Sequence, residues 1–123
     1  SFNFDRGWLN YHRYGQSCKT HGHGSSLIAM TYYIKTPPNC GNLVLIDPTG
    51  GVNFGWTINE KGHTGFKYKE IIPEESKLVF FPGYLLHMVE ENKSNDYRYS
   101  LTSNMGTYNK DELNNFMRNN NVN

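Results

Sequence analysis

The sequence predicts an all-β domain whose strands form a double-sheet jelly roll or a barrel, and three observations support this fold class. Aromatic residues make up 15% of the 123-residue chain, nine of them tyrosines, and aromatic side chains favour strands. Twelve glycines and five prolines supply turn residues, and few segments favour a helix. Strand-like segments alternate with turn signals at intervals of roughly 8–15 residues, a spacing typical of such folds.

Seven segments have the composition or the period-two alternation of short strands. Residues 27–35 are apolar, aromatic and β-branched, and residues 42–47 are predicted to be buried on both faces. The predicted strands cover residues 8–14, 27–35, 42–47, 65–72, 77–81, 85–91 and 97–103. Proline, glycine and asparagine predict turns between them, at residues 36–41, 48–51, 73–76, 82–83 and 92–96.

Two longer segments lack a clear strand pattern. Residues 15–26 are polar, with three glycines and two histidines, which predicts a loop or the irregular end of a strand. Residues 52–63 are polar and are predicted to form a long excursion. A short C-terminal helix is predicted at residues 111–118, with Asn109 as its candidate N-cap, and the Asn-rich end at 119–123 is expected to fray.

Alternate side chains of the predicted strand 27–35 point to opposite faces of the sheet. The even-numbered set is apolar and is predicted to face the core: Ile28, Met30, Tyr32 and Ile34. The odd-numbered set is smaller and more polar, as the wall of a pocket would be: Ala29, Thr31 and Tyr33. Tyr33 could then donate its hydroxyl to a bound acid.

The length fits one domain spanning residues 1–123, with its core at 8–104 and the helix and tail at 109–123. A net charge of +1 argues against nucleic acid or an anionic membrane as a partner recruited by charge. Apolar runs are far too short to span a membrane, and no signal-peptide pattern is present, so a cytoplasmic location is expected. Cys18 and Cys40 lack C-x-x-C spacing and are expected to be free thiols.

Three of the five histidines could together form a metal site. In His21-Gly22-His23, residues i and i+2 of an extended chain point to the same side, so both imidazoles could bind one metal ion. His87 lies in an apolar stretch, where a metal would supply a partner for a buried ring nitrogen. Alternatively, the first pair belongs to a surface loop and His87 is a hydrogen-bonded core residue. The remaining histidines are expected in surface or loop positions: His12 and His63.

One face of the predicted strand 97–103 is polar and carries a fixed positive charge, because Arg98, Ser100 and Thr102 alternate along it. If this face points into a barrel, it forms an anion site in which the forked guanidinium fits a carboxylate. If the opposite, apolar face is the packed one, Arg98 points to solvent.

Short motifs follow one another in a fixed order: His21-x-His23, Thr31-Tyr32-Tyr33, Gly41-x-Leu43, Asp47-Pro48, Phe81-Pro82, His87-x-Val89 and Arg98-x-Ser100, ending in Asn104. In this order, and in the eleven-residue step from His87 to Arg98, the chain resembles the iron(II)- and 2-oxoglutarate-dependent oxygenases of bacteria and phages, a branch similar to the prolyl hydroxylases. The resemblance covers residues 8–104 and implies a double-stranded β-helix, a jelly-roll barrel with iron at its open end.

The resemblance also implies roles for individual residues. His21 and His87 would be iron ligands, and Arg98, helped by Ser100, would hold the distal carboxylate of 2-oxoglutarate. Tyr33 would place its hydroxyl on the same carboxylate. The implied reaction uses O₂ to hydroxylate a substrate, with succinate and CO₂ as co-products. A peptide side chain such as proline is the substrate that the resemblance suggests, while a small molecule or a nucleobase stays open.

The chain departs from the family at one position, because the general pattern has Asp or Glu where this chain has His23. Three neutral histidines would leave the metal its full 2+ charge. Either His23 is the third ligand, or water or another residue completes the site. Asp47 could do so, but Asp-Pro before Thr-Gly is also an ordinary turn start.

Two other classes of protein remain as alternatives. A three-His metal-binding cupin shares the barrel, but cupins have a Glu ligand soon after His-x-His, where residues 25–28 are Ser-Ser-Leu-Ile. The cupin motif Pro-x-Gly-x-x-His also differs from the adjacent Pro82-Gly83. A non-catalytic jelly-roll module, either sugar-binding or a phage structural protein, fits the aromatic composition and predicts neither metal nor 2-oxoglutarate binding.

Overall fold

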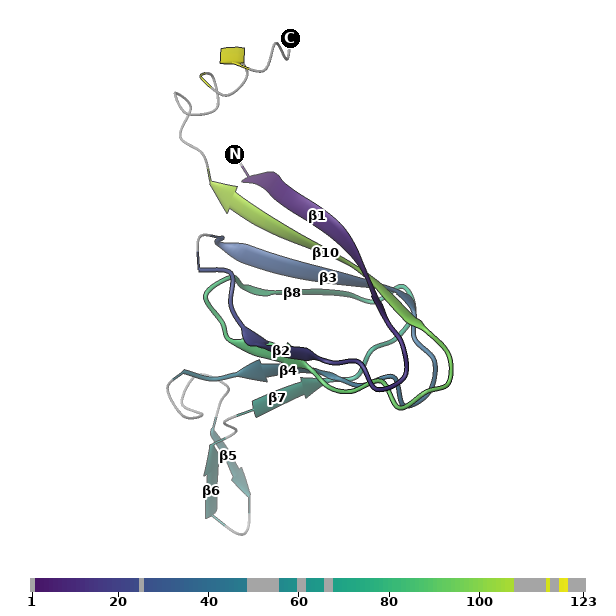
Figure 1. Cartoon of the computed structure of the whole chain (residues 1–123). Helices are drawn as coiled ribbons and strands as arrows, with labels where there is room; N and C mark the ends of the chain where they lie inside the picture. Colours follow the sequence, from purple (N-terminus) through teal and green to yellow (C-terminus); the bar gives the residue numbers. More distant parts are fainter. Residues whose placement is uncertain are drawn as a thin grey trace.

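The computed structural model describes residues 2–24, 26–48, 56–59, 62–65 and 68–107, together with residues 115, 118 and 119. Its strands form two four-stranded sheets and one two-stranded sheet, all antiparallel (Figure 1). The major sheet contains, in spatial order, β1 (Phe2–His12), β10 (Arg98–Thr107), β3 (Ile28–Lys35) and β8 (Leu78–Pro82). The minor sheet contains β2 (Cys18–His21), β9 (His87–Val89), β4 (Leu43–Ile46) and β7 (Tyr68–Ile71). The third sheet pairs β5 (Trp56–Asn59) with β6 (Gly62–Gly65).

The chain passes back and forth between the two larger sheets. Strands β1 to β4 alternate between the major and the minor sheet, and β7 to β10 alternate again. The two larger sheets face each other (Figure 1), and alternate side chains of their strands point into the interior between them. This arrangement is a double-stranded β-helix, which confirms the predicted all-β jelly-roll class.

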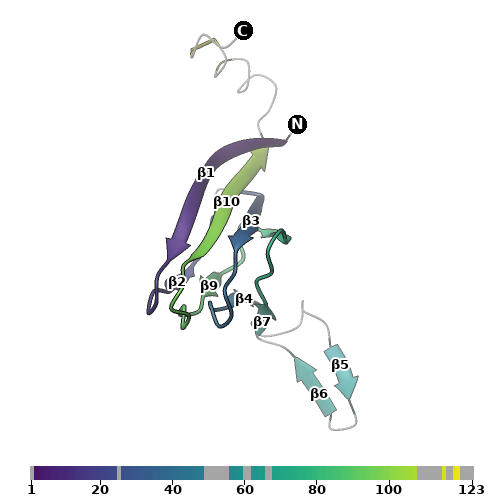
Figure 2. The same cartoon turned by 90° about the vertical axis from the view of Figure 1, so that its right-hand side faces the viewer.

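Two predicted loops contain strands. The segment 15–26 includes β2, where His21 lies directly opposite His87 of β9. The predicted excursion 52–63 includes β5 and part of β6, so His63 belongs to a strand rather than a loop. Figure 2 shows this hairpin projecting away from the two larger sheets. Strand β2 is stabilised by pairing with the distant strand β9, which local composition does not report, and β5 pairs with its sequence neighbour β6.

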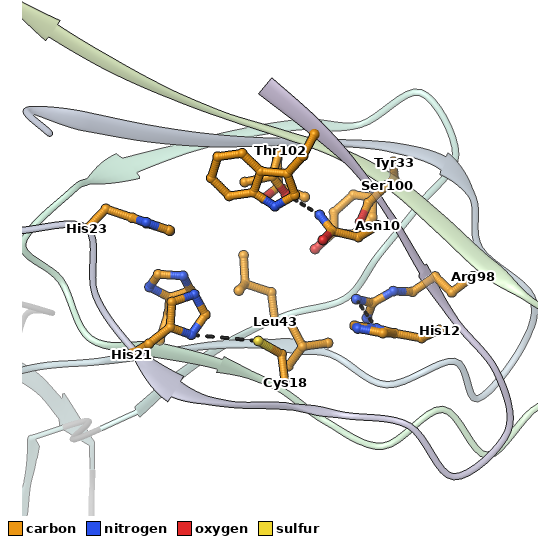
Figure 3. Close-up of a pocket in the computed structure, with 14 residues that line it drawn as sticks. Asn10, His12, Cys18, His21, His23, Tyr33, Leu43, Arg98, Ser100 and Thr102 are labelled. Carbon is orange, nitrogen blue, oxygen red and sulfur yellow. Dashed lines mark hydrogen bonds between the residues drawn. The ribbon is translucent and has the colours of Figure 1, made fainter. Parts of the chain in front are cut away.

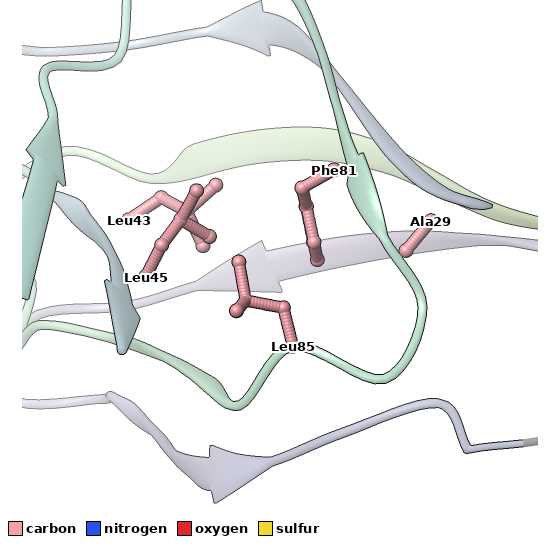
Figure 4. Packing of buried hydrophobic residues seen from close by; sticks show 5 residues of the cluster. All are labelled: Ala29, Leu43, Leu45, Phe81 and Leu85. Carbon is pink, nitrogen blue, oxygen red and sulfur yellow. The ribbon is translucent and has the colours of Figure 1, made fainter. Parts of the chain in front are cut away.

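The hydrophobic core lies between the two sheets. Its centre is a cluster of five buried side chains from β3, β4, β8 and the turn after β8: Ala29, Leu43, Leu45, Phe81 and Leu85 (Figure 4). Three consecutive residues of the predicted strand 42–47 are buried, as expected for a strand covered on both faces: Leu43, Val44 and Leu45. Each large apolar side chain in this cluster stabilises the fold by about 1.5–3 kcal/mol relative to an exposed one.

The predicted core face of strand 27–35 is wrong. Ala29 and Tyr33 are at most 1% exposed, whereas Ile34 is 48% exposed. The smaller, odd-numbered residues therefore face the interior, because the two sheets enclose a pocket and leave little volume beside it. The larger, even-numbered residues belong to the outer face of the major sheet.

That outer face is apolar and open in the described part of the chain. Its exposed side chains come from all four strands: Leu9, Tyr11, Ile34, Leu78, Phe80 and Leu101. No helix among the described residues is long and apolar enough to cross a membrane. The predicted helix at 111–118 lies largely outside the described residues, of which 115 and 118 are helical.

Candidate functional site

The candidate site is a cavity of about 90 Å³ between the two sheets (Figure 3). By the same measure a water molecule needs about 10–15 Å³, so the cavity holds several waters or a small organic acid. Three histidines lie at one end, and a buried arginine lies at the other (Figure 3). Strands β1, β3 and β10 of the major sheet line the wall between the two ends.

The histidine end brings together the three residues singled out in the sequence. His21 ends β2 and His87 begins β9, and their ring centroids are 4.3 Å apart. His23 lies two residues beyond His21, with ring centroids 5.2 Å from His21 and 5.0 Å from His87. One ring nitrogen from each histidine lies within 4.8 Å of the other two, a grouping that could hold a metal ion. The surface-loop alternative for the first pair is therefore wrong.

Backbone carbonyls fix the orientation of two of these rings. Nδ1 of His21 lies 2.8 Å from the Lys19 carbonyl, and Nδ1 of His87 lies 2.9 Å from the Leu85 carbonyl. A carbonyl oxygen only accepts, so each Nδ1 carries the proton and donates it. The lone pair of each ring is then on Nε2, the atom that would bind a metal.

Burial favours the neutral form of His87 and His23, the form that metal binding requires. Burial lowers the pKa of His87 to about 4, and the neighbouring His21 and His23 act in the same direction, against the Leu85 hydrogen bond. The pKa of His23 is also lowered, first by burial and then by His21. Nε2 of His23 is buried without a hydrogen-bond partner. A metal ion would satisfy this nitrogen, so the donor set fits a divalent metal that accepts imidazole ligands.

The opposite end of the cavity is a buried cation. Arg98, the first residue of β10, is 3% exposed, so the alternative that it points to solvent is wrong. Its Nη1 donates to the Gly41 carbonyl at 3.2 Å and its Nη2 donates to Nδ1 of His12 at 2.9 Å. Its Nε is buried without a partner. A carboxylate in the cavity would accept from the guanidinium donors that these two contacts leave unused.

Two hydroxyl groups lie beside this cation, as the polar alternation in the sequence predicted. Tyr33 of β3 and Ser100 of β10 are both buried and line the same cavity (Figure 3). Burial raises the pKa of Tyr33 to about 12, although Arg98 acts against this shift. The phenol therefore stays protonated and is available as a hydrogen-bond donor to an anion.

Strand β1 contributes residues that the sequence analysis missed. Trp8, Asn10 and His12 alternate along the strand and line the cavity, directly opposite Thr102, Ser100 and Arg98 in the sheet register. His12 was expected at the surface or in a loop, but it is half-buried and accepts a hydrogen bond from Arg98. The alternation of Trp8, Asn10 and His12 was the available signal, but only the pairing of β1 with β10 places it against Arg98.

Asp47 is not part of the metal group. It is 2% exposed, but the group formed by the described His, Cys, Asp and Glu residues contains His21, His23 and His87 alone. Cys18 and Cys40 are free thiols, as predicted. Cys18 lines the cavity, with its Sγ 3.7 Å from Nδ1 of His21 (Figure 3).

Comparison with known proteins gives one family and one fold. A family model described as "Putative 2OG-Fe(II) oxygenase" matches residues 6–104. A structure of an oxidoreductase of the 2OG-Fe(II) oxygenase family from Burkholderia pseudomallei has a TM-score of 0.70 and 12% identity, covering 89% of this chain and 47% of that chain. A comparison with curated protein sequences gives no match.

Two further solved structures have the same fold. A prolyl-4-hydroxylase from Pseudomonas putida has a TM-score of 0.59 and 16% identity, over 83% of this chain and 52% of that chain. HygX from Streptomyces hygroscopicus, solved with nickel and 2-oxoglutarate bound, has a TM-score of 0.60 and 10% identity, over 85% of this chain and 57% of that chain. The chain thus spans about half the length of the solved structures that it matches.

Proposed function

Because the chain belongs to the 2OG-Fe(II) oxygenase family, whose metal and cosubstrate are iron(II) and 2-oxoglutarate, we propose that it hydroxylates a substrate at the histidine end of its cavity. Membership confirms the resemblance seen in the motifs. The observation that carries the proposal is a three-histidine group and a buried arginine at opposite ends of one small cavity.

His21, His23 and His87 would hold iron(II) through their Nε2 atoms. This assignment is supported by the carbonyls that take the Nδ1 protons of His21 and His87, and by the unpartnered Nε2 of His23. All three ligands are neutral, so the ion would keep its full charge and attract the anionic cosubstrate more strongly than a site with a carboxylate ligand.

Arg98 would bind the distal carboxylate of 2-oxoglutarate, with Tyr33 and Ser100 donating to the same group. The proposal is supported by the three side chains being buried together, since charge-assisted hydrogen bonds are strongest away from water. His12 and the Gly41 carbonyl each accept one hydrogen bond from the guanidinium, so its remaining donors are available to the ligand.

Bound iron(II) would supply the redox chemistry, in which O₂ oxidises 2-oxoglutarate to succinate and CO₂ and delivers one oxygen atom to a substrate C–H bond. The chain itself would orient the cosubstrate along the cavity and keep its reacting end among the histidines. A peptide side chain such as proline is the substrate class we propose, supported by the fold shared with the P. putida prolyl-4-hydroxylase.

A thermal melt with manganese(II) in place of iron tests the site. Manganese should raise the midpoint, and 2-oxoglutarate should raise it further only when the metal is present. A ligand at one hundred times its Kd adds about 2.7 kcal/mol of stability. In a chain of this size that corresponds to a shift on the order of 10 °C.

Variants of Arg98 make the test specific. Arg98→Ala should abolish the rise in midpoint that 2-oxoglutarate causes and keep the rise that manganese causes. Arg98→Lys keeps the positive charge but loses the planar guanidinium that can donate two parallel hydrogen bonds to a carboxylate. It should therefore reduce the rise in midpoint that 2-oxoglutarate causes. Metal binding without any 2-oxoglutarate effect would instead favour a three-His cupin-like site. Binding of neither ligand would favour a non-catalytic module.

A further inference from the structure

The third histidine of the group is held differently from the other two. His21 and His87 each donate Nδ1–H to a backbone carbonyl two residues earlier in the chain. The neighbour of Nδ1 in His23 is a side chain instead, the Nδ2 amide nitrogen of Asn104, at 3.3 Å. Asn104 lies on β10, on the same face as Arg98 at the start of that strand.

This contact leaves two buried atoms without partners. If Asn104 donates to Nδ1, His23 must carry its proton on Nε2, and that buried atom has no acceptor. Oδ1 of Asn104 is also buried without a hydrogen-bond partner. A buried donor and a buried acceptor are thus both unsatisfied within one pair of side chains, which is costly in a folded protein.

A half-turn of the amide group removes the conflict at His23. The oxygen and nitrogen of an asparagine amide have nearly the same shape, so the group fits its site in either orientation. After the turn, Oδ1 accepts the proton of Nδ1, and Nε2 of His23 bears a lone pair. His23 then has the same tautomer as His21 and His87, and a metal ion satisfies its Nε2.

We propose that Asn104 is a positioning residue that accepts the Nδ1 proton of His23 and so directs Nε2 of this ring at the metal. The inference rests on the proposed three-histidine metal site and adds a residue to it. The backbone of His23 is itself held in place by two hydrogen bonds. Its N–H donates to the Gly83 carbonyl and its carbonyl accepts from the Ser26 N–H.

Two matched variants of Asn104 distinguish a role as hydrogen-bond acceptor from a role as donor. Asn104→Asp keeps an oxygen acceptor at the same place and cannot donate, whereas Asn104→Leu has a similar size and does neither. Cobalt(II) affinity, followed by the visible absorption of the bound ion, should fall 10–100-fold in Asn104→Leu. In Asn104→Asp it should stay within about threefold of the unmodified protein or increase, since an acceptor raises the basicity of the ring. Leu101→Ala, on the exposed outer face of the same strand, is the control and should leave the affinity unchanged.

The tautomer of His23 can be read without any metal. In the metal-free protein with ¹⁵N-labelled histidine, long-range ¹H–¹⁵N spectra should show His23 protonated on Nδ1. In Asn104→Leu a population protonated on Nε2 should appear. Finding His23 protonated on Nε2 in the unmodified protein would overturn the proposal, and this measurement does not depend on the folding of a variant.

A His23→Ala variant distinguishes failure of this inference from failure of the proposed site. If His23→Ala weakens cobalt binding and Asn104→Leu does not, the site stands and the role of Asn104 is wrong. If His23→Ala binds cobalt as tightly as the unmodified protein, His23 is not a ligand, and the three-histidine site fails together with the inference.

Discussion

His12 and Arg98 form a hydrogen-bonded pair at the anion-binding end of the cavity. The hydrogen bond from Arg98 to Nδ1 requires this nitrogen to be unprotonated. Burial, and then the charge of Arg98, lower the pKa of His12, so the ring stays neutral and keeps its acceptor. The neutral His12 ring and the Gly41 carbonyl therefore hold the Arg98 guanidinium in a fixed orientation.

Replacing His12 should affect the cosubstrate and not the metal. His12→Leu removes the acceptor, so the guanidinium loses a restraint, and the Kd of 2-oxoglutarate for the manganese-loaded protein should rise about tenfold, the loss expected for one charge-assisted hydrogen bond. His12→Asn places Oδ1 near the former Nδ1 and should recover most of the affinity. Calorimetric titration measures both constants, and an equal loss of manganese affinity in His12→Leu would contradict this role.

The turn before β4 depends on a glycine that supports the same arginine. Gly41 has φ +84°, and a Cβ there would collide with the Glu90 carbonyl oxygen. Gly41→Ala should therefore destabilise the fold by more than about 1 kcal/mol and weaken 2-oxoglutarate binding, because the Gly41 carbonyl accepts from Arg98. Urea denaturation measures the first effect.

A second glycine provides the control for this prediction. Nothing lies within 4 Å of a Cβ built on Gly24. Gly24→Ala should change the free energy of unfolding by no more than about 0.5 kcal/mol. Equal effects of the two substitutions would mean that strain at Gly41 is not what the turn depends on.

Strand β2 is the edge of the minor sheet and joins it through β9 alone. The pairing is irregular between Cys18 and His21, so this strand has few backbone hydrogen bonds to hold it. A metal bound by His21, His23 and His87 would link the edge strand to its neighbour.

Metal binding should therefore slow amide hydrogen exchange in β2 more than elsewhere. Mass spectrometry with and without manganese should show the largest protection in residues 18–23. The central strand β3, already paired on both sides, serves as the internal reference and should change little. Uniform protection of all strands would indicate general stabilisation rather than a link at the edge.

The whole metal-free molecule should lose stability as the pH falls. His87 binds a proton near pH 6.5 in the unfolded chain, but only near pH 4 in the folded one. Proton uptake between these values favours the unfolded state, so the stability present above pH 6.5 is lost progressively toward pH 4. The lowered pKa values of His12 and His23 act in the same direction.

Thermal melts across this pH range measure the effect. His87→Gln cannot take up the proton and should flatten the dependence. An unchanged pH profile in this variant would assign the effect to other groups.

Local patterns in the sequence were sufficient for the fold class and for most of the candidate site. His21, His23 and His87 could be grouped because a His-x-His spacing and a histidine in an apolar stretch are both visible locally. His12 could not be placed, because its importance comes from the register of β1 against β10, which a single strand does not reveal. The odd-numbered face of β3 was correctly predicted to line a pocket, but the even-numbered face was wrongly assigned to the core, since side-chain size does not show where a cavity takes up the interior.

Strand β10 carries Arg98 at one end of the cavity and Asn104 beside His23 of the other end, an even number of residues apart. Inserting or deleting a single residue between them would turn one of the two side chains out of the barrel. The spacing between Arg98 and Asn104 can therefore change only in steps of two residues if both side chains are to stay inside the barrel. The length of this segment is thus constrained separately from its composition, and in a library of insertions and deletions the binding of metal and 2-oxoglutarate should persist only where the change is even and small.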